Sequence, residues 1–574
     1  MKSIQHQADF CVVGGGLAGL CAAVAAARRG AKTVLMQDRP VLGGNASSEI
    51  RMWVCGAHGK NNKETGLVEE IHLENLYRNN YPTYSIWDSI LYEKARFQTN
   101  LTLLLNCSCT DAAMDGKRIV SIKGWQGTAE TWHTVEAKLF ADCSGDSILA
   151  PLTGASFRVG REAASEFNED IEPAVADRKT MGMSCLIQAR ETDTPQPFVA
   201  PAWANVYASD ADLPNRHHLI EGWQNFWWLE LGGEFDSIHD TELLRDELLK
   251  LAFGVWDHIK NRGDHKAANW VLDWVGFLPG KRESRRYEGD HILTQNDVRA
   301  EGRFDDLVAY GGWSMDDHHP AGIRHPGAPT IFHPAPSPFG VPYRCLYSKD
   351  IENLFFAGRN ISVTHAAMSS TRVMATCATL GQAVGTAAAI ATAKGLTPRG
   401  VYQKELRTLQ EALMDDDAYL PWRKRTVPPL SAGARLTAAA GDPEPLRNGV
   451  DRPVGDAFNG WKGACGQWVE YRFAKPAALT EARLVFDSDL NRQRKNMIAF
   501  YPREMPAFAV PPVMVKAFRL EAEVNGAWKT VARVDHNYQR LARVSISEIA
   551  SAVRFIPEAT WGAPEVTVFA FDVR

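Results

Sequence analysis

The stretch "DFCVVGGGLAGLCAAVAAARRGAKTVLMQD", from Asp9 to Asp38, has the pattern of a strand, a glycine turn, a helix and a second strand. Apolar residues come before the turn, and an Ala-rich segment follows it, a composition that favours a helix. Gly30 ends this segment, as glycine often ends helices. The order of these elements around G-x-G-x-x-G predicts the first β-α-β unit of a dinucleotide-binding fold.

The three glycines of the motif have different tasks. Gly14 makes the tight turn, Gly16 lets a pyrophosphate approach the backbone, and Gly19 lets the helix pack closely on the strand. Leu17 and Ala18 begin the helix, whose free N–H groups and partial positive charge attract a phosphate. We therefore expect these five residues to belong to the cofactor site.

The end of the second strand departs from the usual pattern. An acidic residue commonly stands there to bind the ribose hydroxyls, but this chain has Gln37 followed by Asp38. A Gln amide oxygen accepts one such hydrogen bond, and Asp38 is a second acceptor. Neither side chain suits a 2′-phosphate, so the sequence argues against NADP.

The loop "RPVLGGNASSE", residues 39–49, follows directly and suits a chain that runs beside an extended cofactor through Gly43, Gly44, Asn45 and Ser47. With the glycine turn, it resembles the two-dinucleotide-binding-domain flavoproteins, and specifically the FAD-dependent oxidoreductase family related to fumarate reductase flavoprotein subunits. The resemblance implies FAD as the cofactor. It also implies that this loop leads from the adenosine end toward the flavin ring.

Further segments carry the same resemblance. "FADCSGDSILAPLTGA" is similar to the segment that returns to the FAD site, here with Gly145 and Asp146, and "ENLFFAGRNIS" is similar to the segment that passes the pyrophosphate, here with Gly358 and Arg359. "VGREAASEFNED", "WVGFLPGKRESRRYEGDHILTQNDV" and "VPYRCLYS" resemble a subgroup common in glycan-degrading bacteria. The resemblance spans about residues 8–400 and is specific for FAD and the fold, but not for the substrate.

A long uncharged stretch follows, from Val373 to Ala393. It is long enough for a membrane span, but Thr and Gln interrupt it and Ala and Gly dominate, so we expect a buried core helix and no transmembrane span. The resemblance implies that the N-terminal end of this region faces the flavin. We expect backbone N–H groups near Ser369, Ser370 and Thr371 to bind the flavin O2, and Arg372 either to neutralise the reduced flavin or to pair structurally.

Four residues are candidates for catalysis. His365, just before this helix, is expected to act as a base or donor, with a role in holding the loop as the alternative. Arg285 and Arg286 suit binding of polar or anionic substrate groups, with an ion-pair network involving Glu283, Glu288 and Asp290 as the alternative. His58, in "EIRMWVCGAHGKNN", is expected near the flavin, and covalent attachment through His58 or Cys55 is a less favoured alternative.

The expected fold class is α/β, with a Rossmann-like FAD-binding domain, an inserted α+β substrate domain and a C-terminal β-sandwich. "LRNGVDRP", "NGWKG" and "GQWVEYRFAKPAALTEARL" resemble discoidin, or factor 5/8 type C, domains, which are galactose-binding-like jelly rolls. This sandwich either binds glycans or is structural. The expected boundaries are 1–160 and 340–425 for the discontinuous FAD-binding domain, 161–339 for the substrate domain, 426–445 for a linker, and 446–574 for the sandwich.

The inserted domain contains two notable segments. The aromatic run "WQNFWWLELGGEF" includes Trp223, Phe226, Trp227 and Trp228, which either stack on a sugar or form core. The loop "WSMDDHHPAGIRHPGAPTIFHPAPSPFG" is rich in Pro, Gly and His and is expected to be irregular and functional. Its histidines lack metal-site spacing, so the sequence predicts no metal site.

The bulk composition limits the class of function. The chain has 574 residues and a net charge of −5, with no Lys or Arg block, which argues against nucleic-acid binding. Ten scattered cysteines without CxxC or zinc spacing indicate reduced thiols. The N-terminal segment lacks the pattern of a signal peptide, so we expect a cytoplasmic protein.

The leading interpretation is an FAD-dependent oxidoreductase of the dehydrogenase type. It is expected to oxidise a CH–OH group of a carbohydrate or glycoside by hydride transfer to flavin N5, with a small molecule or oligosaccharide as substrate. Three alternatives remain: a redox-neutral glycoside lyase or glycosidase that works through a transient keto-sugar, a reductase of an unsaturated bond, and a non-catalytic glycan-binding protein. The sequence identifies neither the electron acceptor nor the oligomeric state.

Overall fold

The computed structural model describes residues 1–218, 220, 225–493 and 495–574. The chain forms two compact units. Unit 1 comprises Met1–Ala57, Pro82–Leu409 and Lys495–Ala507, and unit 2 comprises His58–Tyr81, Gln410–Arg494 and Phe508–Arg574. The segment 161–339, expected as a separate substrate domain, therefore belongs to the same unit as the glycine turn.

Unit 1 is built around a mixed seven-stranded sheet. Its strands run in the order β3-β2-β1-β6-β5-β4, and β18 also pairs with β6. The pairs β3-β2, β2-β1, β1-β6 and β6-β18 are parallel, whereas β5 pairs antiparallel with both β6 and β4. The strands are β1 (Lys2–Val13), β2 (Thr33–Met36), β3 (Leu101–Leu104), β4 (Cys107–Asp115), β5 (Arg118–Gln126), β6 (Thr131–Asp142) and β18 (Leu354–Phe356).

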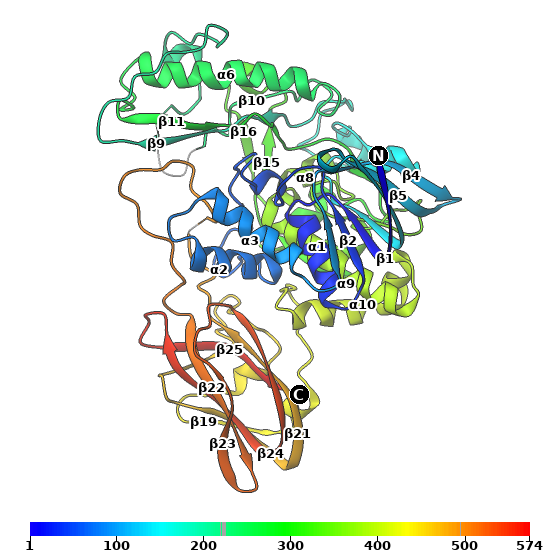
Figure 1. The fold of residues 1–574 in the computed structure, drawn as a ribbon, viewed down its shortest axis with the longest axis vertical. Helices are drawn as coiled ribbons and strands as arrows, with labels where there is room; N and C mark the ends of the chain where they lie inside the picture. Colours follow the sequence, from blue (N-terminus) through cyan, green and yellow to red (C-terminus); the bar gives the residue numbers. More distant parts are fainter. Residues whose placement is uncertain (219, 221–224, 494) are drawn as a thin grey trace. The chain divides into compact units, whose positions relative to one another are not determined.

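Two helices made of small residues pack closely within this unit. Helix α1 (Leu17–Arg28) lies against helix α9 (Met374–Lys394), as Figure 1 shows. A Cβ at Gly381 would lie 2.0 Å from the carbonyl oxygen of Ala18, and a Cβ at Gly385 would lie 2.0 Å from that of Ala22. The glycines are thus required because the two backbones touch. This contact accounts for the Ala and Gly composition of the long uncharged stretch.

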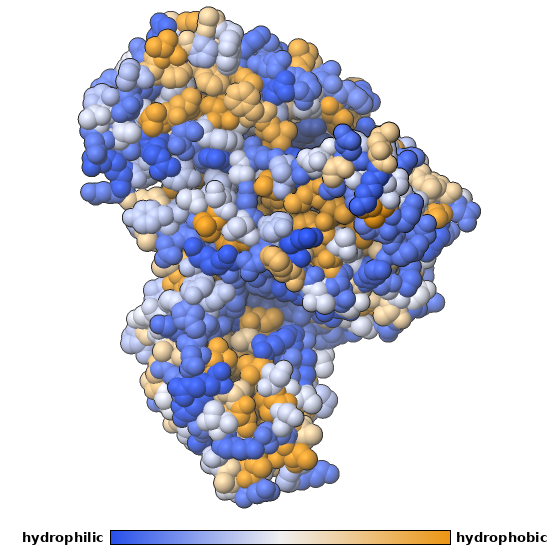
Figure 2. All heavy atoms as spheres, viewed as in Figure 1, coloured by the Kyte–Doolittle hydropathy of each residue, from blue (hydrophilic) through white to orange (hydrophobic). Residues whose placement is uncertain are grey.

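Helix α9 is long and apolar enough to cross a membrane by length and composition. However, 89% of its apolar window is buried inside the protein. On the face drawn in Figure 2, hydrophobic residues form separate patches among hydrophilic ones. We therefore interpret α9 as a core helix of unit 1.

Other helices of this part of the chain surround the sheet or connect its strands. They are α3 (Tyr84–Arg96), α4 (Leu149–Thr153), α8 (His365–Thr371) and α10 (Pro398–Asp415), the last of which continues into unit 2.

Residues 157–342, which include the segment 161–339, contribute small sheets and one long helix to unit 1. Helix α6 (Thr241–Asn261) buries one face against a core that also contains residues of β9 and β11 (Figure 1). The strands are β7 (Phe157–Arg158), β8 (Met183–Ser184), β9 (Ile187–Glu191), β10 (Glu230–Leu231), β11 (Trp270–Val275), β12 (Gly280–Lys281), β13 (Arg286–Tyr287), β14 (Leu307–Gly311), β15 (Met315–His318), β16 (Thr330–His333) and β17 (Phe339–Pro342). Two short helices complete it, α5 (Ala164–Phe167) and α7 (Gln295–Arg299).

The His-rich loop is more regular than the sequence suggested. Strands β15 and β16 pair antiparallel and form a hairpin inside it, from Met315↔His333 to His318↔Thr330. Pro and Gly are concentrated between the two strands and after the second, where they do not interrupt the pairing. As a result, successive side chains of β15 point to opposite faces.

A short segment from the C-terminal part of the sequence joins the core of unit 1. Ala499 and Phe500 are buried in the same core cluster as α6. The backbone N–H of Tyr501 donates to the carbonyl oxygen of Ala189 at 3.0 Å. Lys495–Ala507 therefore belongs to unit 1, although the expected boundaries assigned it to the sandwich.

Unit 2 contains the strand-rich region. Because the long strand β21 pairs with β19, β24 and β25, hydrogen bonds connect all seven strands of this region. Asn525 and Gly526, with φ of 52° and 80°, form the expected hairpin turn between β22 and β23. The elements are α2 (Leu67–Arg78), α11 (Pro429–Gly433), β19 (Arg435–Ala438), β20 (Trp461–Gly463), β21 (Val469–Phe486), β22 (Val515–Val524), β23 (Ala527–Val534), β24 (Leu541–Thr560) and β25 (Val566–Val573).

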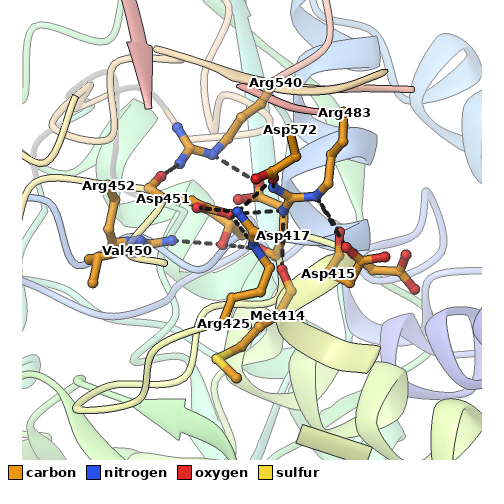
Figure 3. A network of polar contacts seen from close by, with 12 residues as sticks. Met414, Asp415, Asp417, Arg425, Val450, Asp451, Arg452, Arg483, Arg540 and Asp572 are labelled. Atoms are coloured by element: carbon orange, nitrogen blue, oxygen red, sulfur yellow. Dashed lines mark hydrogen bonds and ion pairs between the residues drawn. The ribbon is translucent and has the colours of Figure 1, made fainter. Parts of the chain in front are cut away.

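A buried charge network connects the segment 415–451 of unit 2 to the strands of that unit (Figure 3). The guanidinium of Arg483 on β21 lies 2.8 Å from Asp451 and 3.5 Å from both Asp415 and Asp572. Arg425 pairs with Asp572 at 2.7 Å. Since removal of one partner would leave a buried charge unpaired, this network makes the arrangement of these segments specific.

Candidate functional site

A cavity of about 440 Å³ lies in unit 1, and the glycine turn forms part of its wall. Helix α1, the loop after β2 and the ends of β6 and β18 contribute to the same wall. The predicted cofactor-binding residues that line the cavity are Gly14, Gly16, Leu17, Ala18, Gln37, Asp38, Gly43, Gly44, Asn45, Gly145, Asp146, Gly358, Arg359 and Arg372.

The glycine turn has the geometry that a pyrophosphate requires. Gly14 has φ +98°, and a Cβ there would lie 2.4 Å from the backbone of Ser144. A Cβ at Gly19 would lie 1.8 Å from the carbonyl oxygen of Gly14, so the helix touches the turn. A Cβ at Gly16 would meet only Gly44 Cα, at 4.0 Å, so this position borders open space. Helix α1 begins there without a capping side chain, which leaves its N-terminal end available to a phosphate.

The side chain of Gln37, expected to bind a ribose hydroxyl, forms hydrogen bonds to the protein backbone. Its Oε1 accepts a hydrogen bond from the backbone N–H of Gly15 at 2.6 Å, and its Nε2 donates to the carbonyl oxygen of Val41 at 3.2 Å. The side chain therefore holds the glycine turn and the following loop together. Asp38 remains half-exposed at the edge of the cavity and lies 3.7 Å from Arg39.

Two strand ends that are distant in sequence meet in the cavity wall. Asp146 Oδ1 lies 2.8 Å from the guanidinium of Arg359, and Asp146 Oδ2 lies 2.8 Å from Nζ of Lys281. Burial raises the pKa of the Asp146 carboxyl, but Arg359 and Lys281 more than compensate and bring it to about 2. Nε of Arg359 is buried and has no partner among the described residues. This site can therefore offer a donor to an anionic group.

A second part of the lining, here called the polar wall, comprises Arg282, Asp316, His318 and Arg372. His318 Nδ1 lies 2.6 Å from Oε2 of buried Glu230, and His318 Nε2 lies 3.4 Å from Oδ2 of Asp316. Burial opposes ionisation of Asp316, but His318 in its protonated form and Arg372 lower the pKa of this carboxyl below its usual range.

The two arginines of the polar wall are also fixed in place. Arg372 lies 3.1 Å from Asp316, and its Nε is buried with no partner in the described part of the chain. Arg282 donates to the carbonyl oxygen of Trp227 at 2.7 Å and lies 3.4 Å from Glu230. The charged side chains of the polar wall are thus paired with one another or with Glu230. The Nε of Arg372 is the buried guanidinium nitrogen of this wall that has no hydrogen-bond partner in the described part of the chain.

The sequence matches the family model described as FAD dependent oxidoreductase over residues 9–413. This chain belongs to the FAD-dependent oxidoreductase family. The matched region contains the glycine turn, both strand ends and the polar wall, and membership indicates that the protein binds FAD. The orphaned Arg359 Nε and the open space at Gly16 fit a diphosphate-containing cofactor.

Solved structures are similar to a smaller part of this oxidoreductase. The family 32 carbohydrate-binding module from Streptococcus pneumoniae EndoD is 14% identical, with 25% of this chain and 97% of that chain covered and a TM-score of 0.20. The family 32 module of C. perfringens NanJ, in complex with galactose, is 10% identical, with 25% and 95% covered and a TM-score of 0.18. A comparison with curated protein sequences finds no match.

The predicted catalytic residues of the oxidoreductase do not line the cavity. His365 is buried behind β15, with Nδ1 2.9 Å from Glu283 and Nε2 3.2 Å from Asp317. Burial lowers the pKa of His365, but the two carboxylates raise it well above its ordinary value. A cationic imidazole with both nitrogens occupied suits the expected alternative, a residue that holds the loop, better than a free base. The catalytic role of His365 stays a prediction.

The two predicted arginines also have structural partners. Arg286 is fully buried and lies 3.1 Å from Glu162 and 3.4 Å from Glu283. Arg285 donates to the carbonyl oxygen of Asp146 at 3.4 Å. The arrangement of Arg286 matches the ion-pair alternative that the sequence left open. His58 is exposed and belongs to unit 2, whereas the cavity is lined by unit 1.

Other predicted cofactor residues lie close behind the lining. Ser47 donates from Oγ to the carbonyl oxygen of Gly44 at 2.7 Å and so holds the loop. The hydroxyl of Ser369 donates to Ala366 and that of Ser370 to Trp313. Ser369, Ser370 and Thr371 are fully buried on α8 and do not line the cavity. The N–H groups of His365 and Ala366, at the start of α8, donate to Glu162 and Glu172.

Sequence reasoning missed the residues of the polar wall other than Arg372. Arg282 lies in the motif "GKRESRR", of which only the later arginines, Arg285 and Arg286, were predicted to bind substrate. Asp316 and His318 alternate in "MDDH", a period-two pattern that indicates one face of a strand. In the aromatic run, Phe226 and Trp228 are core, whereas Trp227 lines the cavity. Trp223 lies outside the described residues.

Proposed function

We propose that this flavoprotein is a dehydrogenase that oxidises a CH–OH group of a carbohydrate or glycoside. The observation that carries the proposal is the hydrogen bond of 2.6 Å between His318 and Glu230 in the wall of the cavity that the glycine turn also lines. Bound FAD supplies a two-electron hydride acceptor. The protein must then provide a base for the hydroxyl proton and must orient the substrate.

His318 is the proposed base. Glu230 accepts the Nδ1–H, which fixes the tautomer and leaves Nε2 as the proton acceptor. Nε2 lies 3.4 Å from Asp316, so a substrate hydroxyl that binds between them can donate to Nε2, and Asp316 can then stabilise the imidazolium that forms. The hydroxyl proton would go to Nε2 of His318, bound FAD would supply the acceptor for the hydride, and the product would be a carbonyl compound.

Two arginines set the electrostatics of this step. Arg282 offsets the negative charge of Glu230, since the two side chains lie 3.4 Å apart. Arg372 pairs with Asp316, and its Nε has no hydrogen-bond partner among the residues that the structure describes. A guanidinium with a free N–H beside the cavity suits a site in which negative charge develops. This supports the expected neutralising role of Arg372.

The proposed substrate class rests on the aromatic residues of the cavity. Trp227 and Phe332 line it, and the Trp227 ring lies 5.4 Å from the His318 ring in an edge-to-face arrangement. Aromatic faces stack on the CH faces of sugars, while carboxylates such as Asp316 accept hydrogen bonds from hydroxyl groups. The sequence resemblance to a subgroup common in glycan-degrading bacteria supports the same class.

Anaerobic reduction of the bound flavin by a panel of sugars and glycosides tests this function. We expect one sugar class to bleach the flavin absorbance and to yield a keto product in equal amount. A free sugar that is released without net consumption of an electron acceptor would instead support the redox-neutral glycoside reaction. Bleaching by none of the sugars, together with reoxidation of the reduced protein by an alkene, would support the reductase.

A further inference from the structure

A cluster of three histidines and one aspartate lies away from the cavity, at the C-terminal end of helix α6. It comprises Asp210, His218, His258 and His265. Each residue offers one ligand atom, and all four atoms lie within 4.8 Å of one another. None of the four lines the cavity described above, and the proposed oxidation uses none of them.

The distances within the cluster match those of a metal site. Asp210 Oδ1 lies 3.6 Å from His218 Nδ1, 3.1 Å from His258 Nε2 and 3.6 Å from His265 Nε2. Ligand atoms about 2.0–2.1 Å from a tetrahedral zinc ion are separated by roughly 3.4 Å. The three measured separations from Asp210 bracket that value. The histidine nitrogens lie within 4.8 Å of one another, so the side chains need shifts of up to about an ångström to share one tetrahedral ion.

Hydrogen bonding alone does not account for the cluster. Only the contact of His258 with Asp210, at 3.1 Å, has hydrogen-bond length, because the two at 3.6 Å are too long. Nε2 of His265 is buried and has no hydrogen-bond partner within the described ranges. An unpartnered buried nitrogen is unfavourable, and a bound cation would supply the partner that Nε2 of His265 lacks among the described residues.

His258 also has the outer contact that metal-binding histidines usually have. Its Nδ1 lies 3.0 Å from the carbonyl oxygen of Tyr207, which can accept the Nδ1–H. This hydrogen bond fixes the tautomer in which Nε2 is the free lone pair, directed at the cluster. The imidazole of His258 is fully buried on α6, so its orientation is fixed before an ion binds.

Burial in the cluster differs between the histidines and the aspartate. The side chains of His218, His258 and His265 are 9%, 0% and 7% exposed, whereas that of Asp210 is 73% exposed. An ion would therefore enter from the side of Asp210. This arrangement provides three buried nitrogen ligands and one exposed carboxylate that closes the site.

We propose that Asp210, His218, His258 and His265 form a structural site for one divalent transition-metal ion, with zinc as the best match. Three imidazoles and one carboxylate suit zinc and its neighbours in the first transition row, whereas Ca²⁺ and Mg²⁺ prefer all-oxygen sites. The ion ties the segment 207–218 to the last turn of α6 and to the loop that follows it. All four protein ligands close the coordination sphere, which distinguishes it from an open catalytic site.

The proposal is tested on the full-length protein after removal of any affinity tag. Elemental analysis of protein expressed with zinc in the medium is expected to give one zinc per chain, and a strong chelator is expected to remove it and lower Tm. Adding Co²⁺ to the metal-free protein is expected to produce the visible absorption of a four-coordinate nitrogen and oxygen site. Absence of stoichiometric metal together with no Co²⁺ absorption would overturn the proposal.

Matched variants locate the ion. His265→Ala and Asp210→Asn are expected to reduce zinc content at least tenfold, while His319→Ala, a histidine outside the cluster, retains one zinc per chain. Flavin content and the far-UV spectrum report whether each variant is folded. Because Asp210 is exposed, Asp210→Asn leaves the fold intact even if His265→Ala does not. Wild-type zinc content in both folded cluster variants would place the metal elsewhere and refute the assignment.

Discussion

Nδ1 of His318 lies 2.6 Å from Oε2 of Glu230, and both side chains are almost completely buried beside the cavity. The two residues are separated by 88 positions in the sequence. One is on strand β15 and the other on β10, so the fold brings the proposed base to its orienting carboxylate. Glu230 also contacts Arg282, which offsets its negative charge.

Substitution of Glu230 is the first test of this pair. Glu230→Gln keeps the shape and can accept a hydrogen bond, but it no longer favours one tautomer of His318 or stabilises its protonated form. We expect flavin reduction by substrate to slow by about 10²-fold, within the range for general base catalysis, with little change in FAD content. Stopped-flow absorbance measures the rate. An unchanged rate in a fully loaded variant would show that Glu230 does not act on the reaction.

The glycine turn allows cofactor binding to be separated from folding. Gly16 has φ −61° and ψ 177°, which any residue adopts, and a Cβ there meets only Gly44 at 4.0 Å. Gly16→Val should therefore fold but fill the space that a pyrophosphate needs. We expect FAD affinity to fall at least 100-fold, measured by equilibrium dialysis, while the Tm of the FAD-free protein stays within a few degrees. Stoichiometric FAD in the purified variant would exclude this position from the site.

The packing of α9 on α1 predicts that one added methyl group at their contact lowers the stability of the protein. A Cβ at Gly381 would overlap the carbonyl oxygen of Ala18, so Gly381→Ala must separate the two backbones. We expect a loss of about 1–3 kcal/mol or more, seen as a lower Tm. Gly433→Ala is the matched control, because a Cβ there meets nothing within 4 Å. Equal Tm values for the two variants would contradict the close contact.

Glu172 predicts a pH dependence of stability. It accepts a hydrogen bond from Ala366 N–H at 2.7 Å. Burial raises the pKa of Glu172 from 4.5 to about 7, with nearby Glu162 and Glu169 adding to the rise and His365 opposing it.

A carboxyl whose pKa is higher in the folded state stabilises the fold most below its unfolded pKa of 4.5, and this stabilisation is lost as pH rises through 7. Glu172→Gln stays neutral and keeps an acceptor for Ala366. We expect the Tm of Glu172→Gln to rise relative to that of the wild type as pH increases from 5 to 7. The corresponding change in the free energy of unfolding has an upper limit on the order of 3 kcal/mol. A Tm difference that does not change with pH would show that Glu172 titrates normally.

The glycine turn could be predicted from sequence because its geometry is local. Gly14, Gly16 and Gly19 specify a turn through positions only a few residues apart, and each has the expected geometry. The contact of Asp146 with Arg359 spans 213 positions, yet both residues were predicted, because the segments that contain them resemble cofactor-binding segments of the FAD-dependent oxidoreductase family. Parallel strand ends meet at one edge of a sheet.

The polar wall could not be predicted in the same way, because it depends on which face of β15 meets the cavity. Asp316 and His318 point to the cavity, whereas Asp317 points to the opposite side and bonds His365. The sequence shows that these side chains alternate, but it does not show which face of β15 meets the cavity. Lys495 joins the cavity lining from the C-terminal part of the chain, and no local pattern indicates that.

The rate at which a sugar substrate reduces the bound flavin is the most direct test of the proposed function. Wild type, His318→Gln and His319→Gln are mixed anaerobically with the sugar that bleaches the flavin, and the fast absorbance change is recorded. We predict that His318→Gln retains FAD but reacts at least 100-fold more slowly, while His319→Gln reacts like wild type. Flavin reduction at the wild-type rate in FAD-loaded His318→Gln would contradict the account.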